Sequence, residues 1–260
     1  MRPFVWPRAL VISRQRRDLN LELYDFVQFE PVVGSRVPVG DVLELRLGVG
    51  VQYRNLLLIR REAGAPVVPK LTPADEWRTL FSVGAEFDFG QETLRLDRPH
   101  RLGLEGRAYT LVGRQQLYYV SADYDKVWSA FAYDDIVLGV AGESVAGDVT
   151  FTEEVRLSDH LRGLYGDEFF TDQIASLSLE YRYALVENVL KIAAFHDGAV
   201  FRGFDRETGR EFPRFANAFG LGLTAVVFEF FEASVYGAVG LMSENGPTDI
   251  GLAVSLEQLF

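Results

Sequence analysis

The 260-residue sequence contains no cysteine, which excludes a disulfide framework, a thiolate zinc site and a cysteine nucleophile. Basic residues are also scarce, since 26 Lys and Arg stand against 37 Asp and Glu, for a formal charge of -11. An acidic chain repels phosphate, so we do not expect a nucleic-acid partner. The 48% of hydrophobic residues nevertheless excludes a disordered chain.

Long hydrophobic runs are missing as well. No run approaches the roughly 18 apolar residues of a membrane-spanning helix, and the stretch 224–231 is broken by Glu229. A transmembrane β-barrel remains compatible, because its strands alternate instead of forming long apolar runs. The first residues include Pro3, Pro7 and Arg8 and lack the apolar core and cleavage site of a secretory signal. We therefore expect either a protein that stays inside the cell or a piece of a longer chain.

Alternation of apolar and polar residues recurs along the chain and predicts β-strands. It is clearest at 43–53, 81–89, 149–157, 177–185, 219–227 and 252–260. Soluble strands average about 5–6 residues, whereas several of these runs have the length that a tilted strand needs to cross a bilayer. A soluble sandwich would also alternate. The mixture of Glu, Arg, Ser, Thr and Gly on the polar face is more typical of a wet barrel interior.

Connections between the predicted strands alternate in length. They are short near 186–188 and 229–232 and long at 158–172 and 203–214, which places the C-terminus on the periplasmic side of a barrel. The stretch 60–77 is expected to be a long loop or small plug, and the weakest strand predictions are 9–13, 20–33 and 116–123. The sequence therefore predicts an all-β, antiparallel transmembrane β-barrel of about 12 strands, incomplete or short, as a single domain over 1–260.

Three short motifs follow one another in the last hundred residues. Leu161-Arg162-Gly163-Leu164 lies in the long loop, Ser178-Leu179-Glu180-Tyr181-Arg182 on the next strand, and Phe195-His196-Asp197-Gly198 on the strand after it. With the alternating strand that ends at Phe260, this order resembles the C-terminal half of the bacterial surface antigen outer-membrane barrel. That family comprises the BamA, TamA and two-partner secretion transporter types. The resemblance covers residues 148–260.

The resemblance implies a latch in the lumen. In this family the loop folds back into the barrel, where its arginine meets acidic residues on the two following strands. Carried over by position, Arg162 and Gly163 are the loop motif, and Glu180 and Asp197 are the acidic partners. Leu164 departs from the family's aromatic residue, and Gly198 follows Asp197 at once instead of two residues later. The last strand resembles the family's C-terminal β-signal, through Gly251, Leu252, Val254, Leu256 and Phe260, with Gln258 as a departure.

Other chemistry-bearing residues have simpler readings. Glu180 shares the parity of Ser176, Ser178 and Arg182, so it faces the lumen if the apolar set faces lipid; Arg162, in contrast, could also be a solvated surface arginine. His196 and Asp197 are adjacent on a strand and point to opposite faces, so we expect no catalytic dyad and place His196 outward near the rim. Two acidic pairs, Asp134-Asp135 and Glu153-Glu154, are expected on solvated faces. We expect no metal site and no cofactor.

The resemblance implies a non-catalytic protein of the bacterial outer membrane that inserts or secretes other proteins. Its partners would be membrane lipid and nascent outer-membrane or secreted proteins, and its first and last strands would pair weakly. The family carries periplasmic POTRA domains before a barrel of more strands, so we expect a fragment, or a misassigned start, with N-terminal periplasmic domains missing. Two alternatives stay open: a passive pore or membrane anchor of a larger protein, and a soluble all-β binding protein.

Overall fold

The computed structural model describes residues 2–16, 21–61, 76–89, 100–110, 116–131, 133–150, 153–164, 170–187, 189–205, 210–227, 231–242 and 249–258. Its long strands form one 12-stranded antiparallel sheet. They are β1 (Arg2–Arg16), β2 (Leu21–Val39), β3 (Leu43–Arg61), β4 (Glu76–Asp88), β5 (His100–Thr110), β6 (Gln116–Ser129), β7 (Asp135–Gly147), β10 (Gln173–Val186), β11 (Leu190–Asp205), β12 (Arg210–Val227), β13 (Phe231–Met242) and β14 (Asp249–Gln258). The predicted all-β antiparallel fold of about 12 strands is confirmed.

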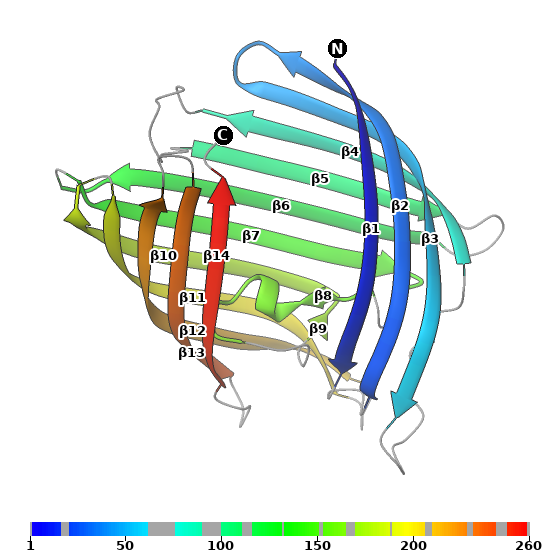
Figure 1. The fold of residues 1–260 in the computed structure, drawn as a ribbon. Helices are drawn as coiled ribbons and strands as arrows, with labels where there is room; N and C mark the ends of the chain where they lie inside the picture. The colour runs from blue at the N-terminus through cyan, green and yellow to red at the C-terminus, as the bar shows by residue number, and fades with distance from the viewer. Residues whose placement is uncertain are drawn as a thin grey trace.

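Strands pair in the order of the sequence, except where β7 pairs directly with β10. The intervening segment holds a small hairpin of β8 (Val155–Arg156) and β9 (Phe170–Thr171) and a 3-10 helix at Leu157–Asp159. Figure 1 shows the sheet curled around this segment, with β1 and β14 both on the near side. Within the described residues, β1 pairs only with β2 and β14 only with β13, so the curled sheet is open between its first and last strands.

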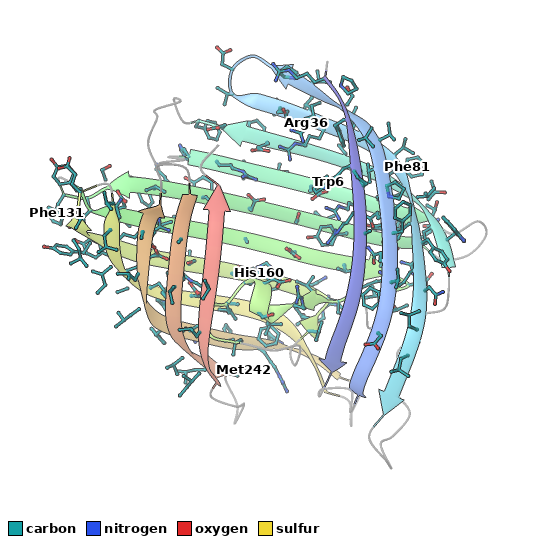
Figure 2. All side chains as sticks on the ribbon, viewed as in Figure 1. Trp6, Arg36, Phe81, Phe131, His160 and Met242 are labelled. Atoms are coloured by element: carbon teal, nitrogen blue, oxygen red, sulfur yellow. The ribbon has the colours of Figure 1, made fainter. Side chains whose placement is uncertain are left out.

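The two faces of the sheet differ in polarity. On β3, Leu45, Leu47 and Val49 are exposed on the outer face, whereas Gln52 and Arg54 are buried on the inner one. Phe81 likewise lies on the outside of the sheet, while His160 lies inside the curl (Figure 2). Apolar side chains therefore face outward and polar side chains line the interior. In the part of the chain that the structure describes, no helix is long and apolar enough to cross a membrane.

Several predicted boundaries change. The weakly predicted strands at 9–13, 20–33 and 116–123 are confirmed as parts of β1, β2 and β6, with residue 20 outside the described residues. The predicted long loop at 203–214 is wrong, because β11 and β12 stay paired as far as Asp205 and Arg210. Of the predicted loop or plug at 60–77, residues 62–75 lie outside the described residues.

The predicted strand at 149–157 is also wrong. Among the described residues of this run, which exclude 151 and 152, only Val155 and Arg156 are in strand conformation, and the chain continues into the 3-10 helix. The apolar residues of that run, among them Val155 and Leu157, pack into a cluster within the lumen instead of onto a sheet face. Their alternation therefore reflects how a folded-back loop buries its side chains.

Candidate functional site: a loop anchored inside the lumen

Residues 153–164 run through the interior of the curled sheet (Figure 1). Leu157, Leu161 and Leu164 are almost completely buried. They form one apolar cluster with inner side chains of the sheet that include Val32 of β2, Leu80 of β4, Ile174 of β10 and Phe201 of β11. We call residues 153–164 the lumen loop. Burial of apolar surface stabilises a fold by about 25 cal/mol per Å², so these leucines hold the lumen loop against strands from both halves of the sheet.

Arg162 of the lumen loop binds both acidic residues that the resemblance had singled out. Its Nε donates to Asp197 Oδ2 at 2.9 Å and its Nη2 to Asp197 Oδ1 at 2.8 Å, which makes a bidentate pair. Its Nη1 donates to Glu180 Oε2. The backbone amide of Arg162 also donates to Asp197 Oδ2 at 3.1 Å, so side chain and main chain are fixed together.

Neighbouring side chains complete the hydrogen bonding of the two carboxylates. Ser178 Oγ donates to Asp197 Oδ1 at 2.7 Å, and Arg182 Nε donates to Glu180 Oε1 at 2.6 Å. The guanidinium of Arg162 lies 3.6 Å from the ring centroid of Phe195 and 5.0 Å from that of Tyr236. The cation therefore sits between carboxylates and aromatic faces, both of which favour a positive charge.

Electrostatics keep Arg162 charged in this position. Asp197 is only 1% exposed and Glu180 only 3%. Burial acts to lower the pKa of Arg162, but the hydrogen bonds and charges of Asp197 and Glu180 outweigh it and raise that pKa above its ordinary value. The arrangement can hold the loop in place.

Gly163 brings the lumen loop into direct contact with β13. Its φ of +117° lies in a region that favours glycine. A Cβ at this position would lie 2.9 Å from Ala238 Cβ and 3.2 Å from the amide nitrogen of Gly240. The position has neither the conformation nor the space for a side chain.

Gly163→Ala is therefore expected to lower the free energy of unfolding by about 1–3 kcal/mol, the range for a residue held in a sparsely populated backbone region. Chemical unfolding of the lipid- or detergent-folded protein measures this change. Gly237→Ala is the control, because no described atom lies within 4 Å of the Cβ it would add, and stability should stay unchanged or rise. Equal losses in the two variants would contradict the close-packing argument.

The C-terminal strand lies at one edge of the sheet. Leu252 and Val254 are strongly exposed on the outer face of β14, and Gly251 pairs with Ala238 of β13. Leu256 pairs with Ala233, and Phe260 lies outside the described residues.

His196 and Asp197 point to opposite faces of β11, as their adjacency predicts. Asp197 faces the lumen, whereas His196 stacks on Phe219 at 4.5 Å and its Nε2 lies 3.1 Å from Asn217 Oδ1. His196 lies in the middle of β11, so its predicted place near the rim is wrong.

The prediction of two solvated acidic pairs is wrong. Asp134 accepts hydrogen bonds from the Ala184 amide at 3.0 Å and from the Tyr181 hydroxyl at 2.6 Å, which hold the pKa of its carboxyl below the usual value. Asp135 forms an ion pair with Lys191. The turn between β6 and β7 is thereby attached to the end of β10 through Asp134 and to the start of β11 through Asp135.

Glu153, of the second pair, is the residue that the sequence argument missed. Its side chain is 3% exposed, and its Oε1 accepts hydrogen bonds from Arg54 Nη1 at 3.0 Å and from Arg78 Nη1. The sequence did contain one signal for this contact. Arg54 shares the polar face of β3 with Gln52, so alternation places its cation inside the barrel, where it needs an anionic partner such as Glu153. Within the described residues, no group of three or more His, Asp or Glu is placed to hold a metal ion.

Comparison with known proteins identifies the fold. No protein-family model matches the sequence, and no curated protein matches it. Among solved structures, the crystal structure of BamA from Haemophilus ducreyi lacking POTRA domains 1–3 is similar, with a TM-score of 0.70 and 13% sequence identity. The match covers 98% of this chain and 59% of that one. The chain therefore has a BamA-like barrel fold and spans about three-fifths of the BamA chain that it matches.

Proposed function

We propose that this chain is an outer-membrane β-barrel of the assembly or translocation type, which inserts or secretes other proteins without catalysis. The observation that carries the proposal is the open seam between β1 and β14 in a BamA-like fold. The unpaired N–H and C=O groups of an edge strand can recruit a further strand. An unpaired edge strand in an otherwise stable sheet is therefore a place where a nascent strand can pair.

The outer surface supports a place in the membrane. Large apolar side chains on it are exposed along nearly every strand, including Phe81, Leu179, Leu221 and Val254. A soluble protein seldom leaves so much contiguous apolar surface in water, whereas lipid covers it without penalty. The proposed partners are therefore membrane lipid and nascent outer-membrane or secreted proteins, and the proposed location is the bacterial outer membrane.

The contents of the lumen favour this reading over a passive pore. The lumen loop lies inside the curl, and its leucines are packed against several strands. Arg162, with its partners Glu180 and Asp197, is proposed to act as a latch that keeps the loop there. The proposed latch is structural, and client recruitment is assigned to the strand edges.

Reconstitution tests the proposal directly. Liposomes containing the chain should accelerate the folding of an unfolded outer-membrane β-barrel client, measured by the shift of folded client on unheated gels. Because the chain has no native cysteine, cysteines introduced at Ala9 on β1 and Val254 on β14, near the middle of the two edge strands, can be joined by a thiol cross-linker. We expect cross-linking to abolish the acceleration. Ion conductance with client folding equal to that in empty liposomes would overturn the proposal in favour of a passive pore.

A further inference from the structure

The lumen loop is attached to the sheet at two separate places. Arg162 binds Asp197 of β11 and Glu180 of β10, in the C-terminal half of the sheet. Glu153 binds Arg54 of β3 and Arg78 of β4, in the N-terminal half. The loop therefore connects two regions of the sheet that are separated along the curl by β5, β6 and β7.

The Glu153 attachment is buried and well connected. The side chains of Arg54, Arg78 and Glu153 are 5%, 2% and 3% exposed. Glu153 Oε2 accepts hydrogen bonds from the Thr150 amide at 2.8 Å and from the Thr150 hydroxyl at 3.0 Å, which fixes the carboxylate to a residue just before the lumen loop. Solvent therefore screens these charges little.

A network extends this attachment toward the edge of the sheet. Arg54 Nη2 donates to Gln28 Oε1 of β2 at 3.0 Å. Glu30, also on β2, accepts hydrogen bonds from Gln52 Nε2 at 2.7 Å and from Gln28 Nε2 at 3.3 Å. The network thus couples Glu153 to the strand that pairs with β1. At the other end, Gly163 lies against β13, the strand that pairs with β14.

We propose that the lumen loop is a strap across the lumen, with Glu153 and Arg162 as its two anchors, and that the strap sets the separation of β1 from β14. This inference rests on the proposed function, because the seam that the strap would control is the proposed entry site for a client. A strap restrains the seam only while both ends are attached. Release of either anchor should therefore have the same effect on the seam as release of both.

The cysteine-free chain suits a distance measurement that needs no client. Spin labels on cysteines introduced at Ala9 and Val254, which are exposed and lie near the middle of the two edge strands, report the width of the seam in liposomes by pulsed electron paramagnetic resonance. Glu153→Gln keeps the side-chain shape and removes the charge that holds two arginines. We expect this variant to shift the distances to longer values and to broaden their distribution.

Matched variants define the outcome. Arg162→Ala should give the same shift as Glu153→Gln, and the double variant should give no further shift. Asp159→Asn removes one negative charge from the same loop at a 51% exposed side chain, and its distances should equal those of the parent. The combined variant Arg54→Gln/Arg78→Gln releases the first anchor from the sheet side, because Glu153 binds both arginines, so it serves as a second test if Glu153→Gln folds poorly.

Unchanged distances in folded Glu153→Gln or Arg54→Gln/Arg78→Gln, or shifts that add in the Glu153→Gln/Arg162→Ala variant, would overturn the strap. Because these distances are measured without a client, a failure of client insertion alone would overturn only the proposed function.

Discussion

Replacing Arg162 by alanine is expected to lower the free energy of unfolding by about 3–5 kcal/mol, the range for removing one partner of a buried ion pair. The loss is large because Asp197 and Glu180 are both almost fully buried and would be left there without the cation that binds them both. Chemical unfolding of the folded protein in liposomes, followed by tryptophan fluorescence, measures the change. On unheated gels the folded band should disappear at a lower temperature than in the parent.

Arg36→Ala is the control for this variant. Arg36 also faces the lumen, but its side chain is 46% exposed and its ion-pair partner Glu44 is 3.9 Å away. Such a pair contributes about 0–1 kcal/mol. Arg162→Lys adds a second comparison, since lysine keeps the charge and loses the bidentate geometry, so its stability should fall between parent and Arg162→Ala. Similar small losses for Arg162→Ala and Arg36→Ala would show that Arg162 is not a latch.

Leu179→Arg is expected to destabilise the membrane-folded protein by about 2–4 kcal/mol, the range for arginine on the lipid face of a barrel near the bilayer midplane. Leu179 lies in the middle of β10 and is 49% exposed on the outer face. Leu185, on the same face near the end of the same strand, is the control. Leu185→Arg should cost about 0–1 kcal/mol because it lies close to the interface.

The depth dependence separates a membrane barrel from a soluble sheet. In water, both substitutions would replace an exposed side chain and change stability by about 0.5 kcal/mol or less. Unfolding in liposomes of different hydrocarbon thickness measures the difference between the two variants. Equal, small effects at Leu179 and Leu185 would contradict the proposed place of the outer face in lipid.

The face of a strand on which a side chain lies could be predicted from the sequence, because it depends only on local periodicity. Parity placed Glu180 on the polar face of its strand, and that face lines the lumen in the structure. Parity also separated His196 from Asp197. The meeting of Arg162 with Glu180 and Asp197 was expected only from the family resemblance, because a loop has no periodicity from which its direction can be inferred.

Contacts between distant parts of the chain could not be predicted in this way. Arg54 and Arg78 are 99 and 75 residues from Glu153. An acidic pair in a predicted strand or loop is ordinarily solvated, so only the curl of the sheet reveals that Glu153 is buried. The same limit explains the wrong strand at 149–157, whose alternating residues pack against strands far away in the sequence.

The sequential order of the strands has a consequence for the folding pathway. Hairpins between consecutive strands close short loops, which is fast, whereas contacts of high sequence separation form slowly because a long loop must close first. Attachment of the lumen loop to Arg54 and Arg78, 99 and 75 residues from Glu153, is a contact of this slow kind. We therefore expect the sheet to form before the loop docks. Glu153 and Arg162 would then make little difference to the folding rate and a large difference to the rate of unfolding, so the loop governs the lifetime of the folded state.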